Sequence, residues 1–342
     1  MSGESSIDTN VQATAAQNNK ETVRTIQSAY FAGGCFWGVE RYFQSVHGVV
    51  STQVGYAQSD VSHPSYEQVC SGQTGAVEAV RVDFDPAVVS VHVLALLLMD
   101  VINPLSHNRQ GNDVGEQYRT GMYFVDDGGD GGDGSGAQRD VYDHVLEQFR
   151  AKTGRSAAVE VLPLKNFYQA EEYHQDYLQN NPGGYCHIDF EKIANVAHRQ
   201  KYIERIWDLD ALQFSVTQKA NTEVPFHNEY DGEYAPGIYV DVVSGEPLFV
   251  SAAKYDAGCG WPSFSKPIDP SKLQYVRDMR IPGRPRIEVR VKESGIHLGH
   301  VFDDGPEAAG GQRYCMNSAS LRFVPRDKMK QEGYGEYLDQ VE

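Results

Sequence analysis

Cysteine is scarce in this chain, and so are long apolar runs and basic side chains. Five cysteines among 342 residues are too few for the disulfide framework that stabilises small secreted domains. No apolar run has the length of a membrane span, and the most apolar stretch, residues 91–101, predicts a core helix instead. The 30 Lys and Arg residues face 47 Asp and Glu residues, which gives a formal net charge of −17. Such a surface repels phosphate backbones and therefore excludes nucleic acid as a partner.

Residues 1–25 show no basic start followed by an apolar core, which a secretory signal would need. Glu4, Asp8 and Glu21 also argue against an acid-poor organelle transit peptide. The polar composition of this segment predicts a disordered tail. From these features we expect a cytoplasmic protein whose disulfides, where they form, are transient and catalytic.

A second polar segment, residues 126–137, alternates Asp and Gly. Such repeats can indicate a calcium loop, but the closing bidentate Glu of an EF-hand is absent. We therefore predict a flexible surface insertion in preference to a metal site.

The first half of the chain predicts an α+β domain over residues 26–190. Strand patterns at 29–32, 49–56, 80–84 and 121–125 alternate with helical patterns at 36–46, 91–101, 141–150 and 168–178. This order predicts a split β-α-β layout, a ferredoxin-like plait with a mixed sheet. Residues 191–207 then predict a helical linker.

The remaining chain, residues 208–330, is rich in short strands and is followed by a C-terminal tail at 331–342. Residues 237–250 predict a hairpin with a turn at 244–246, and residues 287–291 alternate apolar and charged side chains. We expect a second domain of mainly antiparallel strands, either a small barrel or a two-sheet core.

Cys35 is the first candidate nucleophile. It stands in the run Gly-Gly-Cys-Phe-Trp-Gly at 33–38, between a buried strand and an amphipathic helix. At a helix N-terminus the free N–H groups favour the thiolate, and thus a nucleophile. Phe36 and Trp37 could hold a small apolar group beside it. A buried structural cysteine is the alternative, but the paired glycines and the helix start favour catalysis.

Cys315 is the second candidate. In the alternating run at 313–323, Arg313, Cys315 and Asn317 share one face of a strand. A neighbouring guanidinium lowers the pKa of a thiol and makes it reactive. His297 and His300 lie upstream as possible proton donors, and Cys259 offers a thiol in a Gly-rich turn. Cys70 is left over, and we predict an ordinary buried thiol there.

The first half resembles the peptide methionine sulfoxide reductases of type A, and residues 208–326 resemble those of type B. The type A resemblance rests on the runs at 33–38, 63–72, 75–80, 108–119 and 181–186. Ala76 stands where that family's pattern has histidine. The type B resemblance rests on the runs at 258–262, 297–300 and 313–317. It implies one enzyme for each sulfoxide epimer: S for type A and R for type B.

For the first domain the resemblance implies that Cys35 attacks the sulfoxide sulfur and that Glu78 donates the proton. A carboxyl among apolar groups has a raised pKa and suits this role, although a solvated carboxylate on a strand face is the alternative from sequence alone. Cys186 would resolve the sulfenic acid as a disulfide. The remaining implied substrate contacts are Phe36, Trp37, Tyr66, Asp113 and Tyr118.

For the second domain the resemblance implies that Cys315 attacks and Cys259 resolves. His300, helped by His297, would supply the proton, and Asp304 and Asn317 would orient the donors. Arg313 would favour the thiolate, and Trp261 would pack on the substrate methyl group.

Neither cysteine pair forms a Cys-x-x-Cys, which implies thioredoxin as the external reductant. No dinucleotide motif follows a strand, so direct NADPH binding is not expected. Some type B enzymes bind zinc through two Cys-x-x-Cys pairs; this chain lacks them, so we predict no zinc or other bound metal. Three alternatives stay open: a zinc- or ligand-binding module, a thiol peroxidase or redox sensor, and a fusion with one inactive domain. The expected substrates are oxidised proteins or free methionine sulfoxide.

Overall fold

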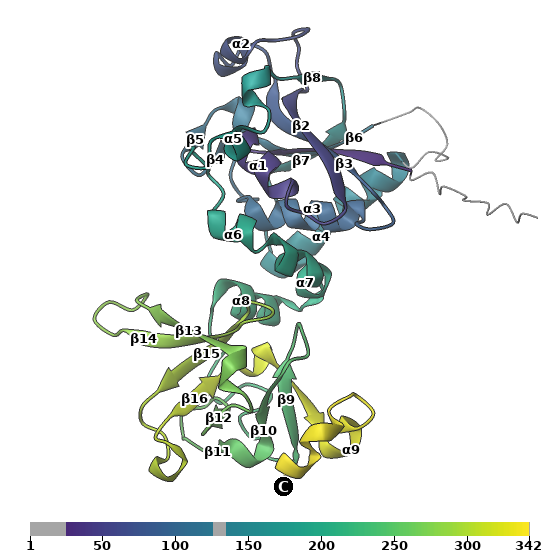
Figure 1. Ribbon diagram of the computed structural model, residues 1–342. Coiled ribbons are helices and arrows are strands. Elements are labelled where there is room, and N and C mark those ends of the chain that lie inside the picture. Colours follow the sequence, from purple (N-terminus) through teal and green to yellow (C-terminus); the bar gives the residue numbers. More distant parts are fainter. Residues whose placement is uncertain (1–24, 126–134, 342) are drawn as a thin grey trace, which may run out of the picture.

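The computed structural model describes residues 25–125 and 135–341. These residues form two bodies that are connected by helices (Figure 1). Nearly all of the predicted N-terminal tail and most of the predicted insertion at 126–137 lie outside the described residues. Helix α4 begins at Ser135, so the last residues of that insertion belong to a helix. Within the described residues no helix is long and apolar enough to cross a membrane.

The first body is built on a six-stranded mixed sheet in the order β7-β6-β1-β3-β2-β8. All its neighbouring strands are antiparallel except the pair β6 and β7. The strands are β1 (Gln27–Gly33), β2 (Val49–Ala57), β3 (Val77–Phe84), β6 (Thr120–Phe124), β7 (Val159–Pro163) and β8 (Phe167–Gln169). A separate two-stranded ladder joins β4 (Arg109–Gln110) and β5 (Asp113–Val114).

Helices α1 (Phe36–Phe43), α3 (Val91–Val101) and α4 (Ser135–Thr153) pack against the sheet. Strand alternation explains which side chains they cover. On β3, Val80, Val82 and Phe84 join the main core, whereas Val77 and Ala79 join a smaller cluster that involves other residues. Glu78 has the parity of the first set and so faces the helices.

Residues 168–178, predicted as a helix, are not one. Their aromatic side chains divide among β8, the 3-10 turn η2 (Glu172–His174) and the short helix α5 (Tyr177–Asn180). Phe167–Gln169 adds an edge strand to β2 by backbone pairing, which local side-chain spacing cannot show. The other short elements here are α2 (Tyr66–Cys70) and η1 (Glu116–Tyr118).

The predicted linker is helical, as α6 (Phe190–Ala194) and α7 (Val196–Asp208). A third helix, α8 (Ala211–Lys219), follows it and was not predicted. Asp210 caps α8 through a capping box with Gln213. The helices α7 and α8 lie between the two bodies (Figure 1).

The second body contains mainly antiparallel strands in two sheets, of orders β10-β9-β17 and β11-β12-β16-β15-β14-β13. The predicted hairpin is β9 with β10. The strands are β9 (Gly237–Asp241), β10 (Pro247–Val250), β11 (Lys254–Tyr255), β12 (Ser263–Phe264), β13 (Leu273–Asp278), β14 (Arg286–Val291), β15 (His297–Phe302), β16 (Arg313–Met316) and β17 (Leu321–Pro325).

Short helical turns complete this body: η3 (Ser251–Ala253), η4 (Pro270–Lys272), η5 (Glu307–Ala309), η6 (Ser318–Ser320), α9 (Arg326–Met329) and η7 (Gly335–Gln340). The C-terminal segment packs on the domain. Val341 is buried, and it shares a cluster with Ile238 and Val240 of β9.

Candidate active sites

Cys35 is the N-cap residue of α1, as the run of glycines before a helical pattern predicts. Strand β1 ends at Gly33, and Gly34 turns the chain with φ +87°. A Cβ at Gly34 would lie 2.5 Å from Cβ of Gln110, so only glycine fits this turn. The turn leaves the Cys35 side chain buried, with 6 % of its surface exposed.

Burial raises the pKa of the Cys35 thiol, and the nearby Glu78 carboxyl raises it further. The backbone N–H groups of Trp37 and Gly38 act in the opposite direction, as expected at a helix start. The prediction of a favoured thiolate is therefore wrong for the resting protein, because desolvation outweighs the helix N-terminus.

Glu78 lies on β3 with 1 % of its surface exposed, which excludes the solvated strand-face alternative. Its Oε2 accepts a hydrogen bond of 3.0 Å from the backbone N–H of Phe36, the first residue of α1. Burial, with a smaller contribution from Asp113, raises the Glu78 pKa to about 8 even though that hydrogen bond lowers it. At neutral pH the side chain is therefore mostly a carboxylic acid, with a proton to donate beside Cys35.

The predicted hydrogen-bonding groups gather around this acid. Burial raises the pKa values of the Tyr66 and Tyr118 phenols, and the Glu78 carboxyl raises both further. Cys35 and Asp113 also raise the pKa of the Tyr118 phenol. The Oδ2 atom of Asp113 accepts a 3.1 Å hydrogen bond from the Tyr185 hydroxyl. The structure thus brings all these predicted residues into one neighbourhood with neutral phenols as donors.

Aromatic side chains of α1 and α5 pack next to the Cys35 turn. Phe36 is buried, and the ring of Trp37 stacks on Tyr177 of α5 with centroids 3.8 Å apart. The indole Nε1 of Trp37 donates to Nδ1 of His174 at 3.1 Å. The sequence did not predict roles for His174 and Tyr177. The helix predicted at 168–178 is incorrect, and it gave no indication that these two side chains contact Trp37.

Glu171 is a third residue that the analysis missed. Its carboxylate accepts the Tyr56 hydroxyl at 2.7 Å and the backbone N–H of Tyr66 at 2.9 Å. These bonds tie the β8–η2 segment to the start of α2 and so fix the backbone of Tyr66. No sequence motif indicates this contact, since it depends on the edge pairing of β8.

Cys186 lies against the same first turn of α1. A Cβ built on Gly38 would be 3.0 Å from Sγ of Cys186. The next residue, His187, forms a 2.8 Å hydrogen bond through Nε2 with the carbonyl of Gly33. The glycine-rich segment before Cys186 is thus docked beside the Cys35 turn, and both thiols are free.

Cys70 does not match its prediction. It is exposed at the end of α2, whereas the sequence predicts a buried thiol. Helix α2 has five residues and buries only Val69, so its last residue has no core to enter.

In the second body, Cys315 and Cys259 lie with their Sγ atoms 3.8 Å apart. Cys315 is on β16, and Cys259 is in the turn before β12, where its Sγ lies 3.3 Å from the Ser263 hydroxyl. Burial and the neighbouring Cys259 raise the Cys315 pKa to about 12, although Arg313 lowers it. The predicted influence of Arg313 has the right sign but is the smaller effect.

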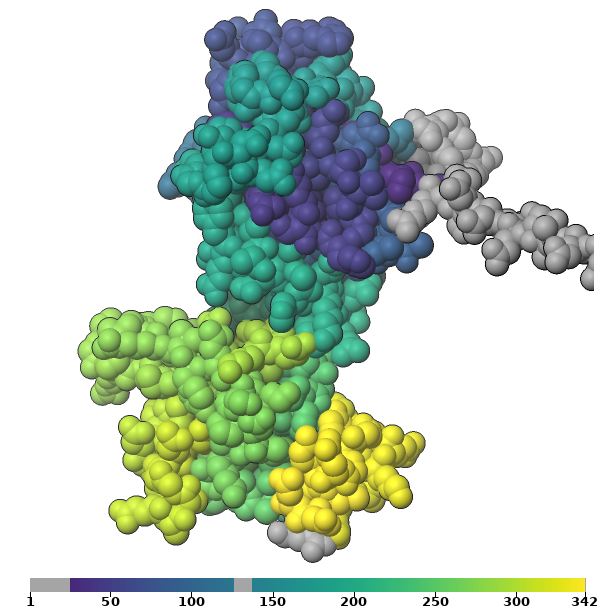
Figure 2. Space-filling view, in the orientation of Figure 1, coloured from purple at the N-terminus to yellow at the C-terminus, as the bar shows by residue number. Residues whose placement is uncertain are grey.

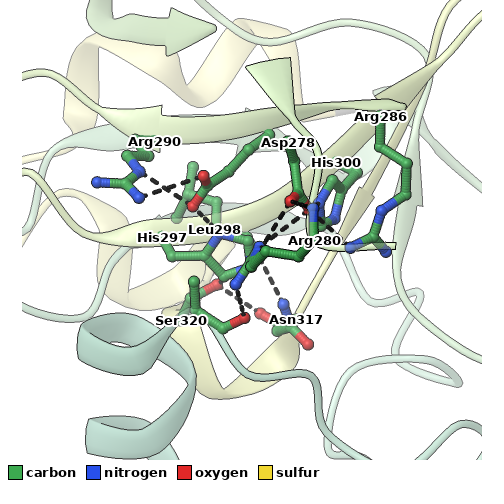
Figure 3. A network of polar contacts seen from close by, with 11 residues as sticks. Asp278, Arg280, Arg286, Arg290, His297, Leu298, His300, Asn317 and Ser320 are labelled. Atoms are coloured by element: carbon green, nitrogen blue, oxygen red, sulfur yellow. Dashed lines mark hydrogen bonds and ion pairs between the residues drawn. The ribbon is translucent and has the colours of Figure 1, made fainter. Parts of the chain in front are cut away.

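On the neighbouring strand β15, His300 is the direct cross-strand partner of Cys315, and the ring of His297 lies 5.5 Å from that of His300. Each histidine is held by a carboxylate. His300 Nε2 lies 2.9 Å from Asp278 (Figure 3), and His297 Nδ1 lies 2.6 Å from Glu288. Burial lowers the His300 pKa, although Asp278 opposes this effect.

The carboxylates are themselves held by arginines. Asp278 accepts from Arg280 and Arg286, which lower its pKa. Burial would raise the Glu288 pKa, but His297 and Arg290 outweigh burial and lower it to about 2. Both carboxylates are therefore charged, and each is able to orient an imidazole.

Asp304 and Asn317, which were predicted to orient the proton donors, form no hydrogen bond with either histidine. Asp304 binds the guanidinium of Arg313 through two hydrogen bonds of 2.8 and 2.9 Å and does not hold a histidine. The Asn317 amide donates to the Leu298 carbonyl at 2.9 Å, so it supports the backbone of β15. Asp278 and Glu288 were missed because they lie on β13 and β14, outside the runs that carry the resemblance.

Trp261 is half-buried beside the thiol pair. Its indole Nε1 donates to the backbone carbonyl of Glu223 at 3.1 Å. The carboxylate of Glu223 accepts in turn from the backbone N–H groups of Ser318 and Ala319, just after β16. This buried carboxylate fixes the ring of Trp261 to the strand that carries Cys315.

Among residues 25–125 and 135–341, no three His, Cys, Asp or Glu side chains come together as a metal site. The five cysteines include no pair spaced as Cys-x-x-Cys, so the residues present do not form the four-thiolate zinc site of some type B enzymes. The absence of bound metal remains a prediction.

Comparison with known proteins finds two matching families and several similar solved structures. A family model for peptide methionine sulfoxide reductase matches residues 27–206, and a model for the SelR domain matches residues 209–325. Among solved structures, Mxr1 from Saccharomyces cerevisiae in reduced form is similar, with 34% identity over 47% of this chain and 88% of that chain and a TM-score of 0.43. Methionine sulfoxide reductase A of Corynebacterium diphtheriae is also similar, with 35% identity over 47% of this chain and 77% of that chain and a TM-score of 0.42.

The two family matches divide the chain where the structure divides it, between α7 and α8. The domain of the first match reduces the S epimer of methionine sulfoxide, and the domain of the second match reduces the R epimer. The chain therefore belongs to the peptide methionine sulfoxide reductase family, as a fusion of a type A domain with a type B domain of the SelR kind.

Proposed function

We propose that Cys35 and Glu78 perform the first domain's reduction as nucleophile and acid. The Sγ atom of Cys35 attacks the sulfoxide sulfur while Glu78 protonates the sulfoxide oxygen. The sulfoxide S–O bond breaks as an S–O bond to Cys35 forms, which leaves Cys35 as a sulfenic acid and releases methionine. The proton of the Cys35 thiol replaces the one that Glu78 donated. The observation that carries the proposal is a buried carboxyl with a pKa of about 8 placed at the start of the helix that Cys35 caps.

The surrounding side chains bind the sulfoxide in this proposal. Tyr66 and Tyr118, both neutral, donate hydrogen bonds to the oxygen, and Asp113 orients them and the water that is released. Phe36 and Trp37 contact the substrate methyl group, with Trp37 held in place by Tyr177 and His174.

Cys186 resolves the sulfenic acid. Its thiol attacks Sγ of Cys35, a disulfide forms, and the hydroxyl leaves as water with the Cys186 proton. The position of Cys186 against Gly38, in the first turn of the helix that Cys35 caps, supports this step.

In the second domain Cys315 attacks and His300 supplies the proton, with His297 beside it. Arg313 stabilises the thiolate as it forms, and Trp261 packs on the substrate methyl group. Cys259 then resolves, and its 3.8 Å distance from Cys315 supports this pairing. We assign the orientation of the histidines to Asp278 and Glu288.

The reduced enzyme is regenerated by a thioredoxin-type partner, because neither cysteine pair is a Cys-x-x-Cys and no dinucleotide motif follows a strand. The proposed role is the repair of oxidised proteins under oxidative stress. The proposed location is the cytoplasm, since so few cysteines suit transient disulfides better than structural ones.

The fold is assigned on the same basis. The order β6-β1-β3-β2, with α1 and α3 as crossovers, supports a split β-α-β plait for the first domain. For the second domain, the two antiparallel sheets support a small barrel-like core.

The decisive experiment measures methionine formation from the S and R sulfoxide epimers of one peptide separately, with thioredoxin and with dithiothreitol. Cys35→Ser should abolish only S reduction, and Cys315→Ser should abolish only R reduction. Cys70→Ser is the matched control because it removes a thiol outside both pairs and should retain both activities. Loss of both activities in either single variant, or turnover of neither epimer by the wild type, would contradict the proposal.

A further inference from the structure

Cys186 and His187 lie in the segment that connects α5 to α6. This segment runs along α1 on the surface of the first domain, where its teal atoms adjoin the purple atoms of α1 (Figure 2). Burial raises the pKa of the Cys186 thiol and outweighs the backbone hydrogen bond at Ile188, which lowers it. The thiol is therefore protonated in the resting protein, although sulfur attacks as the thiolate. The resolving step thus needs a group that removes this proton, and Glu78 holds a proton of its own at that stage.

His187 has one ring nitrogen bound and the other free. Nε2 forms the 2.8 Å hydrogen bond with the Gly33 carbonyl, and a carbonyl oxygen only accepts, so Nε2 carries the hydrogen. Burial lowers the pKa of His187, although the Gly33 carbonyl and Asp113 oppose this effect. The ring is therefore neutral at neutral pH, and Nδ1 carries a lone pair. Nδ1 is buried and has no hydrogen-bond partner among residues 25–125 and 135–341.

The free nitrogen and the Cys186 thiol approach the same residue of α1. A Cβ built on Gly38 would lie 3.0 Å from Sγ of Cys186 and 3.3 Å from Nδ1 of His187. The backbone N–H of Gly38 also forms a hydrogen bond with the Cys35 thiol. Both thiols of the first domain and the free nitrogen thus border one glycine, which has no side chain to separate them.

Asp113 favours a positive charge on the ring of His187. It opposes the effect of burial on the His187 pKa, as a carboxylate beside an imidazole does. The chain just before it passes close to this ring, since a Cβ built on Gly111 would lie 3.4 Å from Cβ of His187. The Tyr185 hydroxyl donates to Asp113 at 3.1 Å, so the same carboxylate is tied to the segment that carries the thiol. A proton accepted by Nδ1 would therefore be stabilised, while burial would help the ring to release it again.

We propose that Nδ1 of His187 accepts the thiol proton of Cys186 in the resolving step. As the proton moves to Nδ1, Sγ of Cys186 forms a bond with Sγ of the Cys35 sulfenic acid, and the S–O bond of that acid breaks. The hydroxyl leaves as water with the proton that His187 returns, so the ring ends neutral. The inference rests on the proposed roles of Cys35 and Cys186, and it concerns only the step that follows methionine release.

The test follows one turnover of the pre-reduced full chain with a peptide that carries S methionine sulfoxide, without added reductant. Samples are quenched with an alkylating reagent, and mass spectrometry measures methionine in the peptide and the Cys35–Cys186 disulfide in the protein. His187→Gln is the main variant, because its amide can still donate to the Gly33 carbonyl but does not accept a proton at neutral pH. We expect methionine formation within twofold of the wild type and disulfide formation roughly 10²-fold slower.

Two controls locate the effect. Cys186→Ser leaves a sulfenic acid that dithiothreitol must reduce directly, so adding His187→Gln to this variant should not change its turnover with dithiothreitol. His227→Gln removes an exposed histidine of the second domain and should behave as the wild type does in S reduction.

A disulfide that forms as fast as methionine does in His187→Gln overturns the role of His187. An equal loss of methionine formation, or a loss that persists in the Cys186→Ser background, also overturns it, because the residue would then act on the first step. Failure of the wild type to form the Cys35–Cys186 disulfide would instead overturn the proposed resolving thiol.

Discussion

At the scale of single residues, the two proposed nucleophiles differ in exposure: Cys35 is buried, whereas Cys315 is only partly buried. Cys35 and Cys315 have raised pKa values because desolvation outweighs the helix start in one case and Arg313 in the other. The sequence could identify these cysteines and Glu78, because motif, strand pattern and charge all lie close along the chain. It could not show the balance of burial against charge, which depends on the complete fold.

The pH dependence of S reduction should follow Glu78. Its pKa is raised to about 8, so the acid form is present below that value and is lost as pH rises through it. Single-turnover reduction of the S epimer by the pre-reduced enzyme, with no added reductant, should therefore slow above pH 8. Glu78→Gln, which cannot donate an acidic proton, should reduce the rate by roughly 10²- to 10⁴-fold.

Reduction of the R epimer by the same variant is the internal control, because that site lies in the other domain. An S rate within twofold of the wild type in Glu78→Gln would show that another group supplies the proton.

At the scale of elements, the sequence predicts the strands and long helices that bury a regular pattern. The short segments that complete the sites are less predictable. Residues 168–178 form an edge strand and two turns because β2 offers backbone partners, and a single helix would leave that edge open. The orienting carboxylates Asp278 and Glu288 escaped prediction for the same reason, since only strand pairing brings them to the histidines.

Glu40 shows how one such segment is attached. It is buried on α1, and its carboxylate accepts the backbone N–H of Asp176 at 2.9 Å and the Thr52 hydroxyl at 3.3 Å. Burial, with the nearby Asp176, raises its pKa to about 7. Glu40 thereby joins the start of α5, and with it Tyr177, to the helix that Cys35 caps.

Replacing Glu40 with Gln should stabilise the protein at alkaline pH. The unfolded carboxyl loses its proton near its ordinary pKa and the folded one near 7, so wild-type stability falls as pH rises between them. Glutamine can still accept the Asp176 N–H with its single Oε1, and its NH2 group can donate to the Thr52 hydroxyl in place of the second acceptor, all without a charge. Urea unfolding should show similar stability at pH 5 and a gain of roughly 1–3 kcal/mol at pH 8.5.

Glu40→Ala is the companion variant, and it should be destabilised at both pH values because it leaves the Asp176 N–H without its partner. If Glu40→Gln gains nothing at pH 8.5, the raised pKa of Glu40 is refuted.

At the scale of the whole molecule, the two domains share a junction with ion pairs and a common core. Arg199 of α7 binds Asp100 of α3 through two hydrogen bonds of 2.5 and 2.9 Å and donates to Gln218 of α8 at 2.8 Å. The hydrophobic cluster around Ile203, Ile206 and Trp207 is continuous with the cores of both bodies. The sequence predicts a helical linker here, but it does not show that this linker packs into the hydrophobic cores of both domains.

Removing Arg199 should weaken this junction. Arg199→Ala leaves Asp100 without its partner at a site where the carboxylate is 17 % exposed, so we expect a loss of about 1–3 kcal/mol in the free energy of unfolding. Arg150→Ala breaks a similar Arg–carboxylate pair with Glu147, but both side chains are well exposed, so the free energy of unfolding should hardly change. Equal losses in urea unfolding would mean that the junction contributes no more than a surface pair.

The position of α7 also determines how separable the two activities are. Its apolar side chains contact the first domain through α3, while Tyr202 and Arg205 donate to Glu293 and to the Val243 carbonyl of the second. Cutting the chain after either family boundary would strip one fragment of this helix and expose the apolar wall of the other. We therefore expect each half, expressed alone, to expose apolar surface that the full chain covers at this junction.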